Sequence, residues 1–226
     1  MNPNRFNFIK EKIKGDLSGQ KVLEVGSRIV TGSIRGYIES LNPEEYVGID
    51  IVPGEGVDLI LDIHQLSEHF GENVFDLIIS SDTMEHIEDL ESASNNMHRV
   101  LKMGGKMVLS VPMMETPYHG FPHDYWRFTL QDMRQLYRGM KVLDEYDTEG
   151  VCIILEKQSE HLDFNSEHPV YSILRGRAIK KHTFLDKKLL SVFRKSMVTL
   201  RKLYVRMMPT ALRNMIRKGI GKSAIN

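Results

Sequence analysis

The chain has little of what secreted and membrane proteins require. Its 226 residues include one cysteine, and no uninterrupted apolar run approaches the about 18 residues of a membrane-spanning helix. The lone cysteine, Cys152, excludes an internal disulfide, and its place in the apolar run 151–155 predicts a packed thiol. Residues 1–16 contain neither an apolar segment nor a small-residue cleavage site. We therefore expect no signal peptide, no membrane span and a cytoplasmic location.

Neither sign of charge is in excess overall, but the charges are unevenly distributed. The 30 basic and 30 acidic residues cancel, yet residues 175–226 carry 15 of the Lys and Arg and a single acid, Asp186. An acidic body followed by a basic tail predicts that the tail meets an anionic partner or packs on the body itself. The polar stretch 158–169 contains helix and strand breakers. We place a domain boundary there, between a domain at 1–160 and a basic helical extension at 170–226.

Short β-rich runs alternate with helical patterns from residue 21 onward, which is typical of parallel strands with crossover helices. Gly104 and Gly105 are expected to end a helix at 89–101, and the short turn at 147–150 makes the last two strands an antiparallel hairpin. The expected strands are 21–25, 45–50, 57–61, 74–80, 106–111, 141–146 and 151–157, and the expected helices are 32–41, 89–101 and one headed by Thr129. The fold class is therefore α/β, with a Rossmann-like, seven-stranded, mostly parallel sheet, a C-terminal antiparallel hairpin and a helical C-terminal extension.

The turn after the first expected strand has the composition of a nucleotide-binding loop. It reads EVGS at 24–27 and continues to Gly32, and glycine lets the backbone approach a ligand closely. The spacing is not the G-x-G-x-x-G of dinucleotide sites, so this motif alone leaves an ordinary strand-to-helix turn open. Asp50 ends the next strand, where a carboxylate can accept hydrogen bonds from both ribose hydroxyls. Because ligands of open α/β sheets bind at the carboxyl ends of the strands, we expect these residues and Asp62 to converge on one crevice.

Over residues 20–145 the sequence resembles the class I S-adenosylmethionine-dependent methyltransferases, in particular bacterial members of the methyltransferase type 11 group. The resemblance lies in LEVGS-x4-GS at 23–33, YVGIDIVPGEGVDLILDIHQL at 46–66, FDLIISSDTMEHIED at 75–89 and the strand 105–112. The sequence departs from a typical member where Arg28 and Ile29 replace further glycines.

The resemblance implies that S-adenosyl-L-methionine is the cofactor. Glu24 and Gly26 would line its methionine part, Asp50 would hold the ribose, and Asp62 with Ile63 would flank the adenine. Residues 81–84 would close the other wall of the site. The full set of expected cofactor-binding residues is Glu24, Gly26, Ser27, Gly32, Asp50, Ile51, Asp62, Ile63, Ser81 and Asp82.

The segment HGFPHDYWRFT at 119–129 follows the fifth expected strand, at the sheet edge where an acceptor would lie. Its side chains can bind a polar acceptor, stack on a ring or remove a proton. The expected substrate-binding residues are Tyr125, Trp126 and Arg127, and the expected catalytic residues, as candidates for a general base, are His119, His123, Asp124 and His86. Structural roles remain the alternative at each position, with His86 orienting a loop, Trp126 packed as an anchor and Arg127 paired with Asp124 or Asp132. A similar DYWRFT string occurs in methyltransferases associated with sugar and polysaccharide pathways.

The nine histidines are scattered along the sequence. No His-x3-His on a helix and no paired cysteines occur, and His119 and His123 lie in a segment that contains glycine and proline. The sequence therefore predicts no metal site.

An apolar stripe at helical spacing runs through the basic tail and predicts a helix that Pro209 ends. Its members are Leu185, Leu189, Phe193, Met197, Leu200 and Tyr204. This helix either packs on its own domain or a second subunit, or it lies on an anionic membrane surface as a peripheral contact. Binding of nucleic acid is the least favoured alternative, because the tail has few stacking residues and no RNA-binding motif.

We expect an S-adenosylmethionine-dependent methyltransferase that methylates an oxygen atom of a polar small molecule or glycan in polysaccharide biosynthesis. A nitrogen acceptor and an oligomeric state are both compatible with the sequence. The alternatives are a quinone or other lipid-linked acceptor and a non-catalytic scaffold that binds the cofactor.

Overall fold

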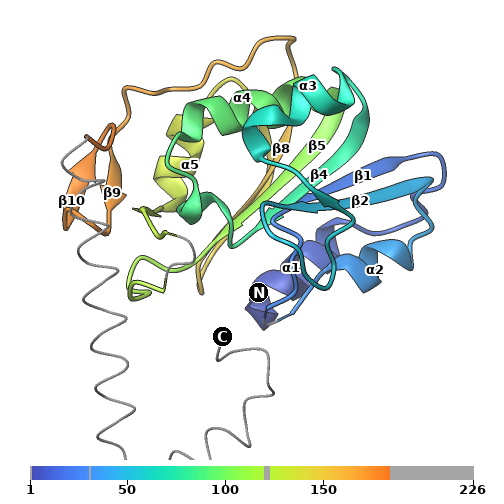
Figure 1. The fold of residues 1–226 in the computed structure, drawn as a ribbon, viewed down its shortest axis with the longest axis horizontal. Coiled ribbons are helices and arrows are strands. Elements are labelled where there is room, and N and C mark those ends of the chain that lie inside the picture. Colours follow the sequence, from blue (N-terminus) through green and yellow to red (C-terminus); the bar gives the residue numbers. More distant parts are fainter. Residues whose placement is uncertain (1, 31, 120–122, 184–226) are drawn as a thin grey trace, which may run out of the picture. The chain divides into compact units, whose positions relative to one another are not determined.

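The computed structural model describes residues 2–30, 32–119 and 123–183, and Figure 1 shows how their helices and strands are arranged. The chain opens with α1 (Pro3–Lys12), β1 (Lys21–Val25), α2 (Arg35–Glu39), β2 (Glu45–Asp50) and β3 (Leu59–Ile60). The short 3-10 helix η1 (Ile63–Gln65), α3 (Leu66–Phe70), β4 (Phe75–Ser81), η2 (Met84–His86), α4 (Leu90–Val100) and β5 (Leu101–Val111) follow. The remaining elements are β6 (Trp126–Arg127), α5 (Leu130–Leu136), β7 (Lys141–Asp147), β8 (Val151–Glu156), β9 (Val170–Ser172) and β10 (Arg177–Ile179).

Seven of the strands form one sheet in the order β3-β2-β1-β4-β5-β8-β7. The pairs from β3 to β5 are parallel, and β8 runs antiparallel to both β5 and β7. The expected Rossmann-like, mostly parallel sheet with a C-terminal hairpin is therefore confirmed. The strands that follow β1 extend the sheet on one side of it, whereas β4 and the later strands extend it on the other. The carboxyl ends of β1 and β4 therefore lie at the point where the strand order reverses, which is where open α/β sheets bind ligands.

Helices cover both faces of the sheet, with α1 and α2 on one face and α3, α4 and α5 on the other (Figure 1). On the first face Ile9, Ile38 and Leu77 are among the buried residues of one apolar cluster. The same cluster contains Cys152 of β8, which is fully buried, and burial raises the pKa of its thiol to about 12. The central strands are buried on both sides, which explains their nearly continuous apolar sequences.

The α4–β5 connection differs from its expected form. The helix ends at Val100, and Leu101 is already extended, so Gly104 and Gly105 lie inside β5 and do not cap the helix. The pairing of β4 with β5 shifts register between Phe75 and Leu77, and Gly104 adopts a φ of +72° within the extra residues. The two glycines therefore belong to a bulge in the strand. A bulge and a helix cap can both require a glycine with positive φ, so the sequence alone does not distinguish them.

Helix α1 was not expected from the sequence, although its start carries a clear signal. The side chain of Asn2 accepts hydrogen bonds from the backbone N–H groups of Asn4 and Arg5, and Pro3 follows the cap. The helix packs Ile9 into the core. The helix is difficult to predict from the sequence because its amphipathic pattern is weak, with Arg5 among its buried residues.

The first residues of the expected C-terminal extension are strands, where the sequence predicted a helix. β9 and β10 form a small antiparallel sheet with β6, so residues 170–179 are joined by backbone hydrogen bonds to the segment around Trp126. The expected apolar helix at 185–204 lies outside the described residues.

Candidate functional site

A cavity of about 650 Å³ opens at the carboxyl ends of β1, β2 and β4. Every residue that the sequence predicted for the cofactor lines it: Glu24, Gly26, Ser27, Gly32, Asp50, Ile51, Asp62, Ile63, Ser81 and Asp82. These residues come from four separate segments, which the parallel arrangement of the strands brings to one edge. The volume of the cavity suits a small organic ligand.

The loop after β1 keeps a tight course although Arg28 and Ile29 replace glycines. Gly26 has a φ of +77°, and the N–H groups of Gly26 and Ser27 both donate to the carbonyl oxygen of Ile49 at 2.9 Å. The N–H of Ile29 donates to the carbonyl of Glu55, also at 2.9 Å. The loop is thus fixed by hydrogen bonds to β2 and the segment after it, so that it needs a glycine only where φ is positive.

Glu24 lies at the bottom of the cavity wall and is almost completely buried. Its carboxylate accepts a hydrogen bond of 2.6 Å from the hydroxyl of Tyr46. Burial raises the pKa of Glu24 to about 7, although the Tyr46 hydrogen bond and the charge of Arg35 act in the opposite direction. The carboxyl is therefore poised to titrate near neutral pH.

Two other acids shape the loops that follow β2 and β3. Asp50 accepts a hydrogen bond from the N–H of Val52 at 3.0 Å, and Asp62 caps η1 by accepting from the N–H of His64. Both carboxylates line the cavity, Asp50 at the end of β2 and Asp62 after β3. A ligand with hydroxyl groups would find acceptors at both positions.

Asp82, directly after β4, has a φ of +50°, a left-handed conformation that is costly for a residue other than glycine. Arg5 of α1 holds its side chain, with Nη1 at 2.5 Å from Oδ1 of Asp82 and 2.8 Å from Oγ of Ser110. The N–H of Asp82 donates to the Ser110 carbonyl. The N-terminal helix therefore reaches the cavity wall through a buried guanidinium, which the sequence interpretation missed.

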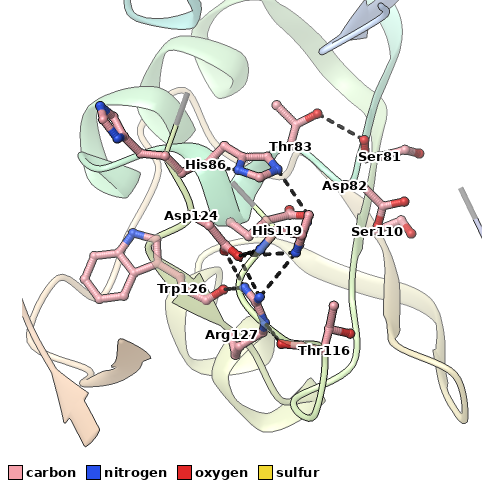
Figure 2. A network of polar contacts seen from close by, with 12 residues as sticks. Ser81, Asp82, Thr83, His86, Ser110, Thr116, His119, Asp124, Trp126 and Arg127 are labelled. Carbon is pink, nitrogen blue, oxygen red and sulfur yellow. Dashed lines mark hydrogen bonds and ion pairs between the residues drawn. The ribbon is translucent and has the colours of Figure 1, made fainter. Parts of the chain in front are cut away.

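The opposite wall carries a connected group of polar side chains, drawn in Figure 2. Asp124 is fully buried and binds Arg127 with both carboxylate oxygens, at 2.5 and 2.7 Å. It also accepts a hydrogen bond of 2.9 Å from the N–H of His119 and lies 3.2 Å from Nδ1 of the same residue. Burial opposes ionisation of Asp124, but the hydrogen bonds from Arg127 and His119 outweigh it and hold its pKa well below the ordinary value.

His86 and His119, two of the histidines that line the cavity, face each other edge to plane, with ring centroids 5.2 Å apart. Nδ1 of His86 lies 2.5 Å from the carbonyl oxygen of His123, which leaves Nε2 directed away from that contact. The contact with Asp124 first, and that with Glu85 second, raise the pKa of His119 to about 10. Nε2 of both rings points at Oε1 of Glu85, at 3.8 Å from His86 and 3.7 Å from His119.

The structure divides the expected acceptor residues into two groups. His86, His119, His123 and Tyr125 line the cavity, whereas Asp124, Trp126 and Arg127 are buried behind it and do not. Trp126 donates from Nε1 to the carbonyl of Ile87 at 2.8 Å, and Arg127 donates to the carbonyls of Thr116 and Pro117. These three side chains fix the course of the loop that carries His119. The sequence interpretation did not single out Glu85, because a buried acid beside a histidine has no local signature.

The chain is similar to proteins described as methyltransferases. Residues 23–109 match a family model described as "Methyltransferase domain". The chain is 30% identical over 125 residues to the ubiquinone biosynthesis O-methyltransferase of Pseudomonas syringae pv. tomato, a match that covers 49% of this chain and 51% of that protein. It is 32% identical over 119 residues to phosphoethanolamine N-methyltransferase 1 of Triticum aestivum, which covers 46% of this chain and 24% of that protein. The chain thus spans about half the length of the Pseudomonas relative and about a quarter of the length of the wheat relative.

Solved structures share the fold at low sequence identity. The 1,6-didemethyltoxoflavin-N1-methyltransferase of Burkholderia thailandensis, with bound 1,6-didemethyltoxoflavin and S-adenosylhomocysteine, superposes with a TM-score of 0.54 at 13% identity. That match covers 70% of this chain and 78% of that one. TehB from Haemophilus influenzae gives a TM-score of 0.52 at 14% identity over 70% of this chain and 63% of that one.

Proposed function

We propose, from the premise that residues 23–109 form a methyltransferase domain whose cofactor is S-adenosyl-L-methionine, that this chain methylates an oxygen atom of a polar small molecule or glycan. One observation carries the proposal. A single cavity is lined both by all ten residues expected for the cofactor and by His86, His119 and His123. A methyl donor and a hydroxyl acceptor could therefore meet inside it.

The cofactor would lie along the carboxyl ends of β1, β2 and β4. In this arrangement Asp50 accepts hydrogen bonds from the ribose hydroxyls, and Asp62 with Ile63 flanks the adenine. The ammonium group of the methionine part lies toward Glu24, whose buried carboxyl group can supply the opposite charge. The positive sulfonium then points toward the wall that holds the histidines.

Methyl transfer from a sulfonium is an in-line displacement. The acceptor oxygen forms a bond to the methyl carbon while the carbon–sulfur bond breaks, and its electron pair stays on sulfur in the S-adenosylhomocysteine product. The acceptor's hydroxyl proton leaves to a base, for which His86 and His123 are candidates that line the cavity, whereas His119, with its pKa raised to about 10, already carries a proton near neutral pH. Asp124 is buried behind His119 and acts through it as a positioning residue. Much of the rate enhancement would come from holding the two reactants aligned in a site that excludes water.

A polar acceptor is favoured by the chemistry of this wall, which combines imidazoles with the hydroxyl of Tyr125 and the backbone around Thr116. An acceptor in a sugar or polysaccharide pathway fits that chemistry. A second candidate, a quinone or other lipid-linked acceptor, is supported by the similarity to ubiquinone biosynthesis O-methyltransferases.

Calorimetric titration with S-adenosylmethionine and S-adenosylhomocysteine tests the cofactor site. Asp50→Ala should weaken binding by at least about tenfold, since it removes a charged acceptor worth about 1.5 to 3 kcal/mol. Asp163→Ala is the matched control, because that exposed aspartate does not line the cavity and should leave binding unchanged.

Release of S-adenosylhomocysteine in the presence of hydroxylated sugars, nucleotide sugars, catechols and short-chain quinols then identifies the acceptor. Turnover with sugars supports the proposal, and turnover confined to quinols supports the second candidate. Tight cofactor binding without turnover on any member of the panel would leave only a scaffold that binds the cofactor.

A further inference from the structure

A carboxylate and two imidazoles from separate segments meet at the histidine wall of the cavity. Glu85 and His86 belong to η2, and His119 belongs to the segment after β5. One ligand-type atom of each lies within 4.8 Å of those of the other two. We propose that Glu85, His86 and His119 bind one divalent transition-metal ion of the Zn²⁺ type.

Glu85 is the first part of the argument. Its side chain is fully buried, and neither carboxylate oxygen has a hydrogen-bond partner among the residues that the structure describes. Among the described residues, the side-chain nitrogen atoms of ionisable groups that lie within 4.0 Å of Glu85 are Nε2 of His119 and Nε2 of His86, at 3.7 and 3.8 Å from Oε1. A hydrogen bond between such atoms would be about 2.7 to 3.2 Å long. A buried carboxylate without a donor is expensive, so a cation between these atoms would satisfy it.

The spacing is that of ligands around a common ion. Zinc lies about 2.0 to 2.2 Å from nitrogen and carboxylate oxygen, so that two ligands of a tetrahedral site are about 3.4 Å apart. The two Glu85 distances exceed this value by less than about 0.5 Å. A small rotation of the two rings would close the set around one ion.

Both histidines are also oriented as metal ligands are. In metal sites the ring nitrogen that does not bind the ion usually donates to a carbonyl or carboxylate, which fixes the tautomer. Here Nδ1 of His86 lies 2.5 Å from the His123 carbonyl, and Nδ1 of His119 lies 3.2 Å from the Asp124 carboxylate and 3.3 Å from Nη2 of Arg127. Asp124 is held in turn by Arg127. With the proton of each ring on Nδ1, the Nε2 lone pairs of both rings would be available to one ion near Glu85.

The donor set indicates the kind of ion. Two imidazoles and one carboxylate match the catalytic His₂Glu class of zinc sites, whereas Mg²⁺ and Ca²⁺ prefer oxygen ligands. Three protein ligands leave at least one position free, on the cavity side, because His86 and His119 line the cavity and Glu85 lies behind them. If the proposed function holds, the acceptor's oxygen takes this position, where a cation lowers the pKa of its hydroxyl. The proton then leaves to His123 or to water.

The test uses the full chain, stripped with a chelator and titrated with Co²⁺, whose visible absorption bands report tetrahedral coordination by nitrogen and oxygen. The wild type should bind about one equivalent, and Zn²⁺ should displace it and raise Tm. Glu85→Gln, His86→Asn and His119→Asn should each weaken Co²⁺ binding by at least about tenfold. His69→Asn, which changes an exposed histidine of α3, is the matched control and should bind as the wild type does.

Affinity for S-adenosylhomocysteine, measured on the same samples, separates this proposal from the proposed function. Variants that lose Co²⁺ but keep S-adenosylhomocysteine locate the metal site without reference to any acceptor. Binding of less than about half an equivalent by the wild type would overturn the proposal, and Glu85 would then be neutralised by the His119 imidazolium alone. Equal Co²⁺ binding by the wild type and all three ligand variants would overturn it as well.

Discussion

Gly26, in the turn after β1, leaves no room for a side chain. A Cβ atom there would lie 2.0 Å from Oγ1 of Thr83, and the φ of +77° is already unfavourable for any other residue. Thr83 cannot move freely, because its hydroxyl donates to the carbonyl of Ser81 at 3.0 Å. Gly26→Ala should therefore lower the free energy of unfolding by about 1 to 2 kcal/mol from the backbone alone. It should also weaken S-adenosylhomocysteine binding by at least about tenfold, measured by calorimetry.

Gly36→Ala is the control for this substitution. Gly36 lies in α2 with nothing within 4 Å of its added Cβ, and alanine is the better helix former by about 1 kcal/mol. This variant should be as stable as the wild type or more stable. Similar stabilities and affinities for the two variants would contradict the role assigned to the tight turn.

Glu24 gives the protein a pH dependence of stability. Its pKa is raised to about 7 by burial, above the ordinary value of 4.5, so the folded state binds more protons between these two pH values. The free energy of unfolding should fall as pH rises through this window and level off above pH 7. The contribution is up to about 3 kcal/mol, since each pKa unit corresponds to about 1.4 kcal/mol.

Glu24→Gln should remove this contribution while keeping an acceptor for Tyr46. Urea unfolding should show the variant to be more stable than the wild type at pH 8, with the difference shrinking toward pH 4.5. Glu44→Gln, at an exposed position, should leave the pH profile of the wild type unchanged. A constant difference between Glu24→Gln and the wild type at all pH values would be inconsistent with the titration.

At the scale of elements, α1 and its N-cap residue link the β7–β8 turn to the end of β4 beside the cavity. Asn2 and Asn4 donate to the carboxylate of Glu149 in the β7–β8 turn, while Arg5 holds Asp82. Arg5→Ala should cost roughly 1 to 3 kcal/mol, less than the 3 to 5 kcal/mol of a fully buried pair, because the Asp82 side chain is 28% exposed. Chemical denaturation measures this loss.

The same variant should bind S-adenosylhomocysteine more weakly, because Asp82 lines the cavity in a strained conformation that Arg5 helps to hold. Asn7→Ala, on the exposed side of the same helix, controls for helix propensity. An Arg5→Ala variant that loses stability but binds with wild-type affinity would restrict the role of α1 to the fold.

The strands could be predicted from the sequence because each is a short apolar run between breakers, and β1 and β2 begin and end as expected. The grouping of the expected residues in one cavity followed from the strands, since parallel strands place their carboxyl ends together. Three features could not be predicted in this way. A glycine such as Gly104 suits a bulge as well as a helix cap, and α1 buries an arginine where an apolar residue is expected. Trp126, which was expected to contact the substrate, packs behind the cavity lining.

The grouping of Glu85 with two histidines illustrates a limit of local patterns. His86 and His119 are separated by α4 and β5, and no spacing rule relates them. The sequence therefore predicted no metal site, whereas the chain fold brings a candidate set of ligands together.

At the scale of the whole molecule, the uneven charge suggests a surface partner for the tail. None of the helices within residues 2–30, 32–119 and 123–183 is long and apolar enough to cross a membrane. The sequence from 185 to 204 nevertheless combines an apolar stripe with basic pairs, a pattern typical of helices that lie on anionic lipid. We propose a peripheral contact of this kind.

Cosedimentation with vesicles tests this contact. The full chain should bind vesicles rich in phosphatidylglycerol, bind phosphatidylcholine weakly, and dissociate as salt is raised. Replacing Lys187 and Lys188 with Gln should lower the partition coefficient at least tenfold, at about 1 kcal/mol per basic residue. The same change at Lys10 and Lys14 should have little effect, and equal losses for both pairs would argue against a specific role of the tail.

The buried thiol of Cys152 can be used to measure how often the core of the protein opens. Because the only thiol in the chain lies in the core against β5 and β7 with its pKa raised to about 12, reagents such as dithiobisnitrobenzoate cannot reach it while the sheet is closed. The rate at which a large excess of reagent consumes that thiol in native buffer therefore measures how often the sheet opens. Slower consumption with S-adenosylhomocysteine present would show, without any label or substitution, that cofactor binding at the strand ends restrains motion of the core.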